Sequence, residues 1–234
     1  FNGFDIDCNG NNNGALEVIS SGGTGSLATE WSTGQNTPSI FGLAPGNYEV
    51  TVSDVNDCTI SQVATVEEPP LLTISLNTDQ QVSCYGGGDA QVSAISVGGV
   101  NGHEYSLDEM NWQATPVFSD LAAGSVTVHV RDGNGCRSEA IQTLVEPAPI
   151  TISFSNVIDA QCNDPVGSAE ASATGGSGSF QYQWYDENDA PLNAGFMLVN
   201  AIAGVYRVDV LDTKDCLTSD FVADLVERVN VFLS

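Results

Sequence analysis

Positive charge is scarce in this chain of 234 residues. Lysine and arginine together number 5 and histidine 2, against 30 aspartates and glutamates, so the formal net charge is −25. A field of this sign repels phosphate backbones and anionic lipid headgroups. Composition therefore argues against nucleic acid and acidic membrane surfaces as partners, whereas divalent cations remain candidates.

Long apolar runs are missing as well. The chain is 41% hydrophobic, which is enough for a folded core, but no run approaches the ~18 apolar residues of a membrane span. Helical periodicity of useful length is also absent. Charged residues make up only 15% of the chain, so Ser, Thr, Asn, Gln and Gly must supply the polar surface. We expect a soluble, globular chain with no membrane insertion and no nucleic acid partner.

What the chain has instead is internal repetition, which decides the fold before any local pattern does. The six cysteines form three pairs with separations of 50, 52 and 54 residues, and the first cysteines recur after 76 and 78 residues. The pairs are Cys8 and Cys58, Cys84 and Cys136, and Cys162 and Cys216. Each pair predicts one copy of a repeated unit.

Every copy carries the same local signals. A Gly-rich turn and a short alternating run follow the first cysteine, and a Gly-Gly pair marks a tight loop. A strand of alternating apolar residues then leads into Asp and Asn turn residues before the second cysteine, which predicts a hairpin. The three blocks run from Leu43 to Asp54, from Leu121 to Asp132 and from Ile202 to Asp212.

A Val-Glu phrase closes each copy, followed by proline in the first two. Proline is excluded from central strands, so these phrases predict linkers between domains. We expect repeat 1 at residues 1–69, truncated at its N-terminus, repeat 2 at 70–148 and repeat 3 at 149–228, with 229–234 starting a fourth unit. The predicted architecture is all-β, with three tandem Ig-like antiparallel β-sandwiches cut from a longer array.

The cysteines predict a disulfide framework in an exported protein, because their number is even and the C-x-x-C spacing of zinc sites is absent. We expect one disulfide in each repeat, joining its first and second cysteine. Closing such a ~50-residue loop would stabilise a small domain by about 4 kcal/mol. The alternative joins Cys58 to Cys84 and Cys136 to Cys162 across the linkers, and it leaves Cys8 and Cys216 unpaired.

These motifs together resemble the SprB repeat, found in very large surface adhesins of Bacteroidetes. The resemblance rests on the C-x-G-x-x-x-G turn from Cys8 to Gly14, the Gly-Gly loop, Trp31, the L-A-x-G-x-Y-x-V-x-V-x-D block and the D-x-N-x-C hairpin. Repeat 2 departs from it with Val126 and Leu107 in place of the Tyr and Trp. The resemblance implies type IX secretion, display on the outer membrane and, in gliding species, movement along the cell.

Catalysis is not expected. A nucleophile needs a base and a group that orients the base. The two histidines, His103 and His129, have no counterparts in the other repeats.

Calcium is the one cofactor candidate, since it prefers oxygen ligands from Asp, Asn and Glu. One cluster precedes the first core, and three others occupy the hairpins. The candidates are Asp5, Asp7, Asn9 and Asn11, then Asp54, Asn56 and Asp57, Asp132 and Asn134, and Asp212 and Asp215. The alternative is that Asp and Asn serve as hairpin residues that bond their own backbone.

The aromatic residues divide into two groups. Trp31 and Trp184 occupy matching strand positions, as core residues of a sandwich do. Trp112 and Tyr85 are specific to repeat 2 and are candidates for a ligand surface.

The leading functional hypothesis is therefore a segment of a cell-surface adhesin. It would act as an extended stalk, as a multivalent element that binds an extracellular surface or polysaccharide, or as both, with neighbouring repeats as partners. The alternative is a set of carbohydrate-binding or spacer modules of a secreted polysaccharide hydrolase.

Overall fold

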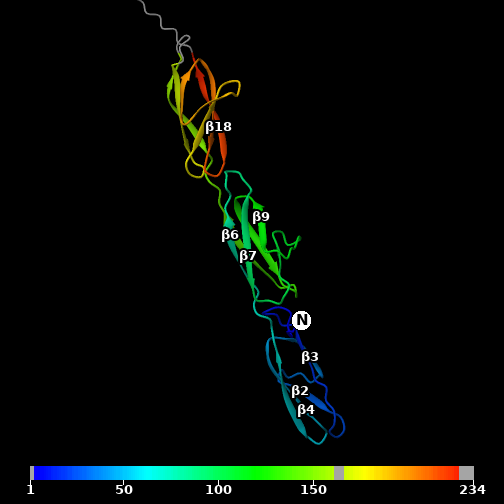
Figure 1. The fold of residues 1–234 in the computed structure, drawn as a ribbon. Coiled ribbons are helices and arrows are strands. Elements are labelled where there is room, and N and C mark those ends of the chain that lie inside the picture. The colour runs from blue at the N-terminus through cyan, green and yellow to red at the C-terminus, as the bar shows by residue number, and fades with distance from the viewer. Residues whose placement is uncertain (1–2, 161–165, 227–234) are drawn as a thin grey trace, which may run out of the picture. The chain divides into compact units, whose positions relative to one another are not determined.

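The structure, a computed structural model, describes residues 3–160 and 166–226. These residues form strands and turns without a helix (Figure 1), and the strands of repeats 1 and 3 pair antiparallel. The predicted all-β, Ig-like class is confirmed. No described segment is a helix long and apolar enough to cross a membrane.

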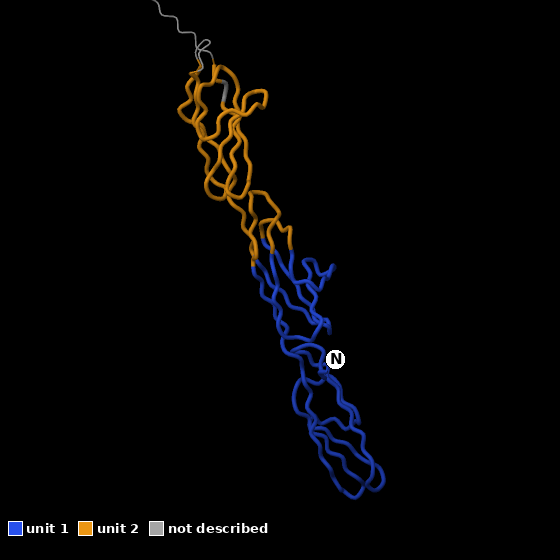
Figure 2. The backbone as a smooth tube through the Cα atoms, in the orientation of Figure 1, with its two compact units in different colours: residues 1–77, 92–118, 125–142 blue, residues 78–91, 119–124, 143–234 orange. Residues whose placement is uncertain are grey.

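The chain divides into two compact units, coloured in Figure 2. Unit 1 comprises residues 1–77, 92–118 and 125–142, and unit 2 comprises residues 78–91, 119–124 and 143–234. The division runs through repeat 2. The predicted repeat boundaries, including the fourth unit at 229–234 outside the described residues, stay predictions.

Repeat 1 folds as two facing sheets, with strand orders β1-β3 and β2-β4-β5. Its strands are β1 (Gly14–Glu17), β2 (Ala28–Trp31), β3 (Ser39–Leu43), β4 (Gly46–Ser53) and β5 (Thr59–Val66). The hairpin of β4 and β5 is regular, with pairing from Gly46 and Val66 at one end to Ser53 and Thr59 at the other.

Repeat 2 has the same order with one strand added at its start. Its sheets are β6-β7-β9 and β11-β10-β8. The strands are β6 (Thr73–Gln80), β7 (Ala90–Val97), β8 (Glu104–Ser106), β9 (Val117–Leu121), β10 (Gly124–Arg131) and β11 (Arg137–Leu144). The opening strand β6 has no counterpart among the described residues of repeat 1.

Repeat 3 repeats this plan and adds an edge strand. Its sheets are β12-β13-β16 and β15-β14-β17-β18. The strands are β12 (Thr151–Ile158), β13 (Gly167–Thr174), β14 (Gln181–Tyr185), β15 (Pro191–Ala194), β16 (Met197–Ala201), β17 (Gly204–Leu211) and β18 (Leu217–Leu225). Strand β12 opens repeat 3 as β6 opens repeat 2.

The cores follow the predicted alternation. Trp31 in repeat 1 and Trp184 in repeat 3 are 3% and 0% exposed, among alternate valines of β4 and β17. Each indole nitrogen donates to a backbone carbonyl, that of Thr37 at 2.9 Å and that of Gly195 at 3.0 Å. A buried indole needs such a partner for its N–H, so the prediction that both tryptophans are core residues is confirmed.

The disulfides differ from both predicted sets. Cys8 is bonded to Cys136 and Cys84 to Cys216, with Cα atoms 5.6 and 5.5 Å apart. Cys58 is an exposed free thiol, and Cys162 lies outside the described residues. The prediction of one disulfide within each repeat is wrong for the four bonded cysteines, and so is the alternative that joins Cys84 to Cys58 and Cys136 to Cys162.

The length of the sandwich explains this correction. In repeat 1 the Cys8 turn lies at the Val66 end of the β4–β5 hairpin, where Asp5 N donates to Glu67 O at 3.0 Å. Cys58 lies in the turn at the opposite end of that hairpin. Eight strand residues span about 23 Å, whereas a disulfide joins Cα atoms no more than ~7 Å apart. The first cysteine of one repeat instead meets the second cysteine of the next.

Candidate functional site

The most elaborate polar arrangement surrounds these disulfides. In unit 1, Asn134 Nδ2 donates to the backbone oxygen of Asp7 at 2.8 Å, and Cys136 Sγ lies 3.2 Å from the same oxygen. In unit 2, Cys216 Sγ lies 3.3 Å from Ser83 O. The residue before the first cysteine thus faces the second cysteine of the following repeat in both cases.

The Val-Glu segment that closes a repeat, with the linker after it, binds the cysteine turn of the same repeat. Gly10 N donates to Glu68 Oε2 at 2.6 Å, and Asn9 Nδ2 donates to Pro69 O at 2.9 Å. In unit 2, Gly86 N donates to Glu146 Oε2 at 2.6 Å. A carboxylate that accepts from a backbone amide makes a strong, charge-assisted bond. The linker and the cysteine turn of a repeat are therefore bonded into one structural unit.

One aspartate organises each hairpin. Its Oδ1 accepts two amides of the hairpin, and its Oδ2 accepts one amide from the Gly-Gly loop region. Asp54 accepts the amides of Asn56, Cys58 and Thr24. Asp132 accepts those of Asn134, Cys136 and Val100. Asp212 accepts those of Lys214, Cys216 and Ser177, and all nine distances lie between 2.7 and 3.1 Å. Asp132 and Asp212 are buried, so these bonds satisfy charges that would otherwise be costly.

These bonds also set the acidity of two of the carboxyls. The backbone bonds from Cys58, Thr24 and Asn56 hold the pKa of Asp54 below its ordinary value. Burial raises the pKa of Asp212, but the bonds from Cys216, Lys214 and Ser177 and the charge of Lys214 outweigh it, so this pKa is also lowered. Both side chains stay ionised at neutral pH.

Side-chain oxygens of several calcium candidates therefore accept hydrogen bonds from hairpin and turn amides. Asp57 and Asp215 sit at the hairpin tips with φ of 60° and 61°, as turn residues do. Asp5 Oδ2 accepts Glu67 N, and Asp7 Oδ1 accepts Cys8 N and Asn11 Nδ2. No group of three or more His, Cys, Asp or Glu side chains within the described ranges is arranged to hold a metal. Calcium binding stays a prediction.

The Gly-Gly loops receive the linkers. Gly99 N donates to Pro70 O at 2.8 Å, and Gly176 N donates to Ala148 O at 2.9 Å. A Cβ on Gly98 would lie 1.9 Å from Leu71 O, and one on Gly175 would lie 2.1 Å from Pro149 O. Both positions also have φ near +85°, so only glycine admits the linker backbone here.

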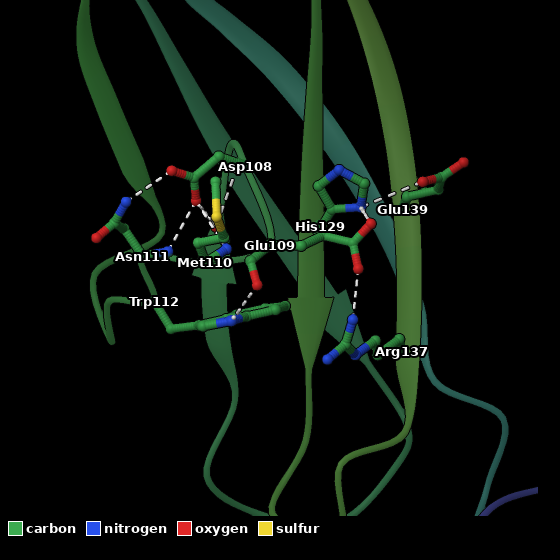
Figure 3. Close-up of polar contacts among 9 residues, drawn as sticks. Asp108, Glu109, Met110, Asn111, Trp112, His129, Arg137 and Glu139 are labelled. Carbon is green, nitrogen blue, oxygen red and sulfur yellow. Dashed lines mark hydrogen bonds and ion pairs between the residues drawn. The ribbon is translucent and has the colours of Figure 1, made fainter.

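The Trp112 loop of repeat 2 is ordered by Asp108, whose Oδ1 accepts the amides of Met110 and Asn111 (Figure 3). Trp112 is half-buried, and its Nε1 donates to Glu109 O at 3.0 Å. The guanidinium of Arg131 lies 4.4 Å and that of Arg137 5.5 Å from the ring centroid. Cations over an indole face are attractive, so this loop is a built surface feature.

The charged cluster beside this loop was not predicted from the sequence. Glu109 pairs with Arg137 and lies 3.7 Å from His129, which also faces Glu139 at 3.2 Å (Figure 3). Glu109 comes from the Trp112 loop, His129 from β10, and Arg137 and Glu139 from β11. One hint was available, because two of only five basic residues, Arg131 and Arg137, flank the hairpin of repeat 2.

Tyr85 belongs to a different place. It is 60% exposed and lies in unit 2 beside the Cys84–Cys216 disulfide, in an open cavity of about 210 Å³ lined also by Pro147 and Pro149. Trp112 belongs to unit 1. The two candidates for a ligand surface therefore fall in separate units, Tyr85 at a junction between repeats and Trp112 on the flank of a sheet.

His103 takes part in a small polar network. Ser96 Oγ lies 2.7 Å from His103 Nδ1 and 2.6 Å from the Tyr105 hydroxyl, and His103 Nε2 lies 3.1 Å from Gly98 O. A backbone carbonyl, not a carboxylate, orients the imidazole, and the serine hydroxyl is shared with tyrosine. The network ties β7 to β8 beside the Gly-Gly loop.

This geometry defines a class of protein, Ig-like β-sandwich repeats that are joined through disulfides between successive repeats. Residues 154–189 match the family model described as the SprB repeat, which supports the resemblance that the sequence motifs indicate. A comparison with curated proteins finds no match.

Among solved structures, similarity is found to cell adhesion and modular proteins. The fragment of the Down syndrome cell adhesion molecule with eight Ig domains is 12% identical, with TM-score 0.38. The alignment covers 88% of this chain and 33% of that fragment. A tetra-tandem repeat from the extending region of a large adhesion protein is 15% identical, with TM-score 0.27, covering 95% and 72%. The fibronectin(III)-like modules of Clostridium thermocellum CbhA are 16% identical, with TM-score 0.31, covering 65% and 94%. The chain spans about a third of the first of these.

Proposed function

We propose that the chain is a non-catalytic repeat segment of a large cell-surface adhesin. Following the family resemblance, the adhesin is exported by type IX secretion, displayed on the outer membrane and used in adhesion and gliding. The segment works as an extended stalk and as a multivalent element for an extracellular surface or polysaccharide. Neighbouring repeats are its immediate partners.

The observation that carries this proposal is the pairing of cysteines between successive repeats. A junction with a proline linker, a bonded cysteine turn and a disulfide is held both by covalent bonds and by hydrogen bonds. A stalk depends on such joints to keep successive repeats connected, so these junctions support the stalk role. The match of residues 154–189 to the SprB repeat supports the same function.

Multivalency and charge fit this role. Tethered copies raise the effective concentration of each weak binding site. The net charge of −25 keeps neighbouring arrays apart. Weak contacts, summed along many repeats, would then hold a cell to a surface while single contacts exchange.

The proposal is tested by binding the purified, oxidised chain to a panel of polysaccharides and abiotic surfaces, first with calcium and then with a chelator. Saturable binding to one class of surface supports the adhesive role, and its loss with chelator supports a calcium site. Absence of binding in both conditions would reject the adhesive role and leave the stalk role alone.

The Trp112 loop is the first surface to probe. Trp112→Ala should weaken binding at least tenfold if the stacked ring contacts the ligand. The melting temperature of the variant should stay within a few degrees of the parent, because other residues form the core. Phe41→Ala, at an aromatic that is 71% exposed in repeat 1, is the matched control. Equal binding by both variants would remove Trp112 from the adhesive surface.

A further inference from the structure

Repeat 1 presents a hairpin of the kind that is bonded in repeats 2 and 3. We propose that the Asp54–Cys58 hairpin and the groove beside it form a docking site for the linker and cysteine turn of another repeat of this kind. Docking ends in a disulfide between Cys58 and the first cysteine of that repeat.

The hairpin is already in the bonded shape. Asp54 Oδ1 accepts the amides of Asn56 and Cys58 at 2.9 and 3.1 Å, as Asp132 accepts those of Asn134 and Cys136 at 3.0 and 2.9 Å. In repeat 2 this shape presents its second cysteine to the turn of the preceding repeat. Cys58 is presented in the same way, and it is exposed and unbonded.

Asn56 supplies a second contact for the incoming turn. Its counterpart Asn134 donates to Asp7 O, the carbonyl just before the bonded Cys8. Asn56 lies two residues before Cys58, as Asn134 lies two residues before Cys136. It is therefore positioned to bind the backbone that precedes an incoming cysteine.

The loop for the linker is formed as well. Gly22 has φ +92°, close to the +85° of Gly98 and the +86° of Gly175. At those two glycines the linker backbone approaches within the reach of a Cβ, whereas a Cβ on Gly22 would meet nothing within 4 Å. Repeat 1 thus keeps the left-handed conformation that the linker requires, with the linker position open.

A groove with mixed polar and apolar lining continues from this loop. It has a volume of about 440 Å³ and is lined by residues that include Val18, Ile19, Leu27, Val52 and Cys58. Ile19 is 91% exposed. In repeat 2 the linker residue Leu72 is buried, and in repeat 3 Ile150 packs on the core. The groove therefore fits a linker that carries an apolar side chain at this position.

The linker and the cysteine turn of the docking repeat are bonded to each other, so they would bind as one unit. A linker carbonyl and the closing glutamate both bind the cysteine turn in repeat 1, at Asn9 and Gly10. A linker seated on Gly22 and Gly23 would thus bring its cysteine turn to Cys58. The hairpins of repeats 2 and 3 show the same arrangement with the disulfide formed.

The bond forms by ordinary thiol–disulfide exchange. A disulfide oxidant, such as oxidised glutathione, first forms a mixed disulfide with one cysteine and releases one reduced thiol. The thiolate of the second cysteine then attacks the sulfur of that protein cysteine and releases the second reduced thiol. Overall two protein thiols lose two protons and two electrons, which the oxidant takes up as two thiols.

The test is a polypeptide that contains two full copies of the chain in tandem. At the junction, Val226 precedes the next Cys8 by 16 residues, close to the 18 between Val66 and Cys84 and the 17 between Val145 and Cys162. The first copy supplies a complete preceding repeat for the second copy. After refolding with oxidised and reduced glutathione, free thiols are alkylated and the protein is cleaved at aspartate. Ile60→Val, at an exposed site, marks the peptide from the second copy.

We expect Cys58 of the second copy to be bonded to Cys162 of the first and fully protected from alkylation. Cys58 of the first copy has no preceding repeat and should be alkylated, which makes it an internal control. Gly22→Ala in the second copy should lower the yield of the bond several-fold, and in the first copy it should not. Alkylation of both Cys58 residues, or a bond from Cys58 to any cysteine other than Cys162, would overturn the proposal. Neither result depends on whether the chain binds a surface.

Discussion

Cys8 is bonded to Cys136, 128 residues further along the chain, and not to Cys58 at the other end of its own hairpin. Each described disulfide starts in the first cysteine of one repeat and ends in the second cysteine of the next. The cysteines therefore stabilise junctions, whereas the core of each sandwich depends on residues such as Trp31 and Trp184.

Removing this bond should weaken the junction of repeats 1 and 2. Replacing both Cys8 and Cys136 with serine opens a loop of more than 100 residues, which the chain-entropy model equates with a loss of up to about 5 kcal/mol. Calorimetry and limited proteolysis of the linker measure the effect. Cys58→Ser is the control and should melt like the parent, and a double variant that also melts like the parent would contradict the structural role of the bond.

The buried aspartates should be sensitive to loss of charge. Asp212→Asn keeps one acceptor oxygen but turns a second position into an NH₂ group that faces an amide donor, so we expect a loss of about 2 kcal/mol. Asp215→Asn, at the exposed tip of the same hairpin, should cost little because Asn also tolerates its positive φ. Chemical denaturation compares the two variants. Equal costs would show that the Asp212 network adds nothing.

Acid should destabilise the hairpins. The folded pKa values of Asp54 and Asp212 are lowered, so the unfolded chain binds more protons around its own carboxyl pKa of about 3.9. The stabilisation is complete above that pH and is lost as the pH falls through the lower folded values. Melting temperatures recorded from about pH 7 to about pH 2 should fall at the acid end. Asp212→Asn should flatten this fall, and a curve unchanged by the substitution would exclude Asp212 as a contributor.

The Gly-Gly loops offer a matched pair of substitutions. Gly98→Ala puts a Cβ against Leu71 O and adds left-handed strain, so it should cost more than about 3 kcal/mol. Gly22→Ala has the same backbone strain without the contact and should cost about 1 kcal/mol. Denaturation of the two variants measures the difference. Similar losses would mean that the linker moves aside at little cost.

Much of the fold could be predicted from the sequence, because its signals are local. Alternation fixed the long strands before each second cysteine, and the Asp and Asn residues marked the hairpins correctly. Equal spacing of the cysteines also suggested equal pairing, and here the inference failed. Spacing along a chain reports nothing of which end of a sandwich a residue occupies, and an eight-residue strand such as β4 already separates Cys8 from Cys58 beyond bonding range.

The polar sites show the same limit. The Asp54, Asp132 and Asp212 hairpins were visible as Asx turns, but their third bond, to the Gly-Gly loop, joins segments about 30 residues apart. Glu109, His129 and Glu139 meet across three segments of repeat 2. Such contacts depend on strand register, which a single sequence leaves undetermined.

The order of the disulfides also determines how the chain carries tension. The Cys8–Cys136 and Cys84–Cys216 bonds make two covalent nodes, and the backbone connects these nodes three times, through residues 8–84, 84–136 and 136–216. A pull on the two ends of an unfolded chain is therefore limited by the shortest of the three segments. The 52-residue segment extends to about 180 Å, whereas the 208 residues from Cys8 to Cys216 would reach about 700 Å without the bonds. The two bonds therefore limit how far the chain can lengthen even after its sandwiches have unfolded under load.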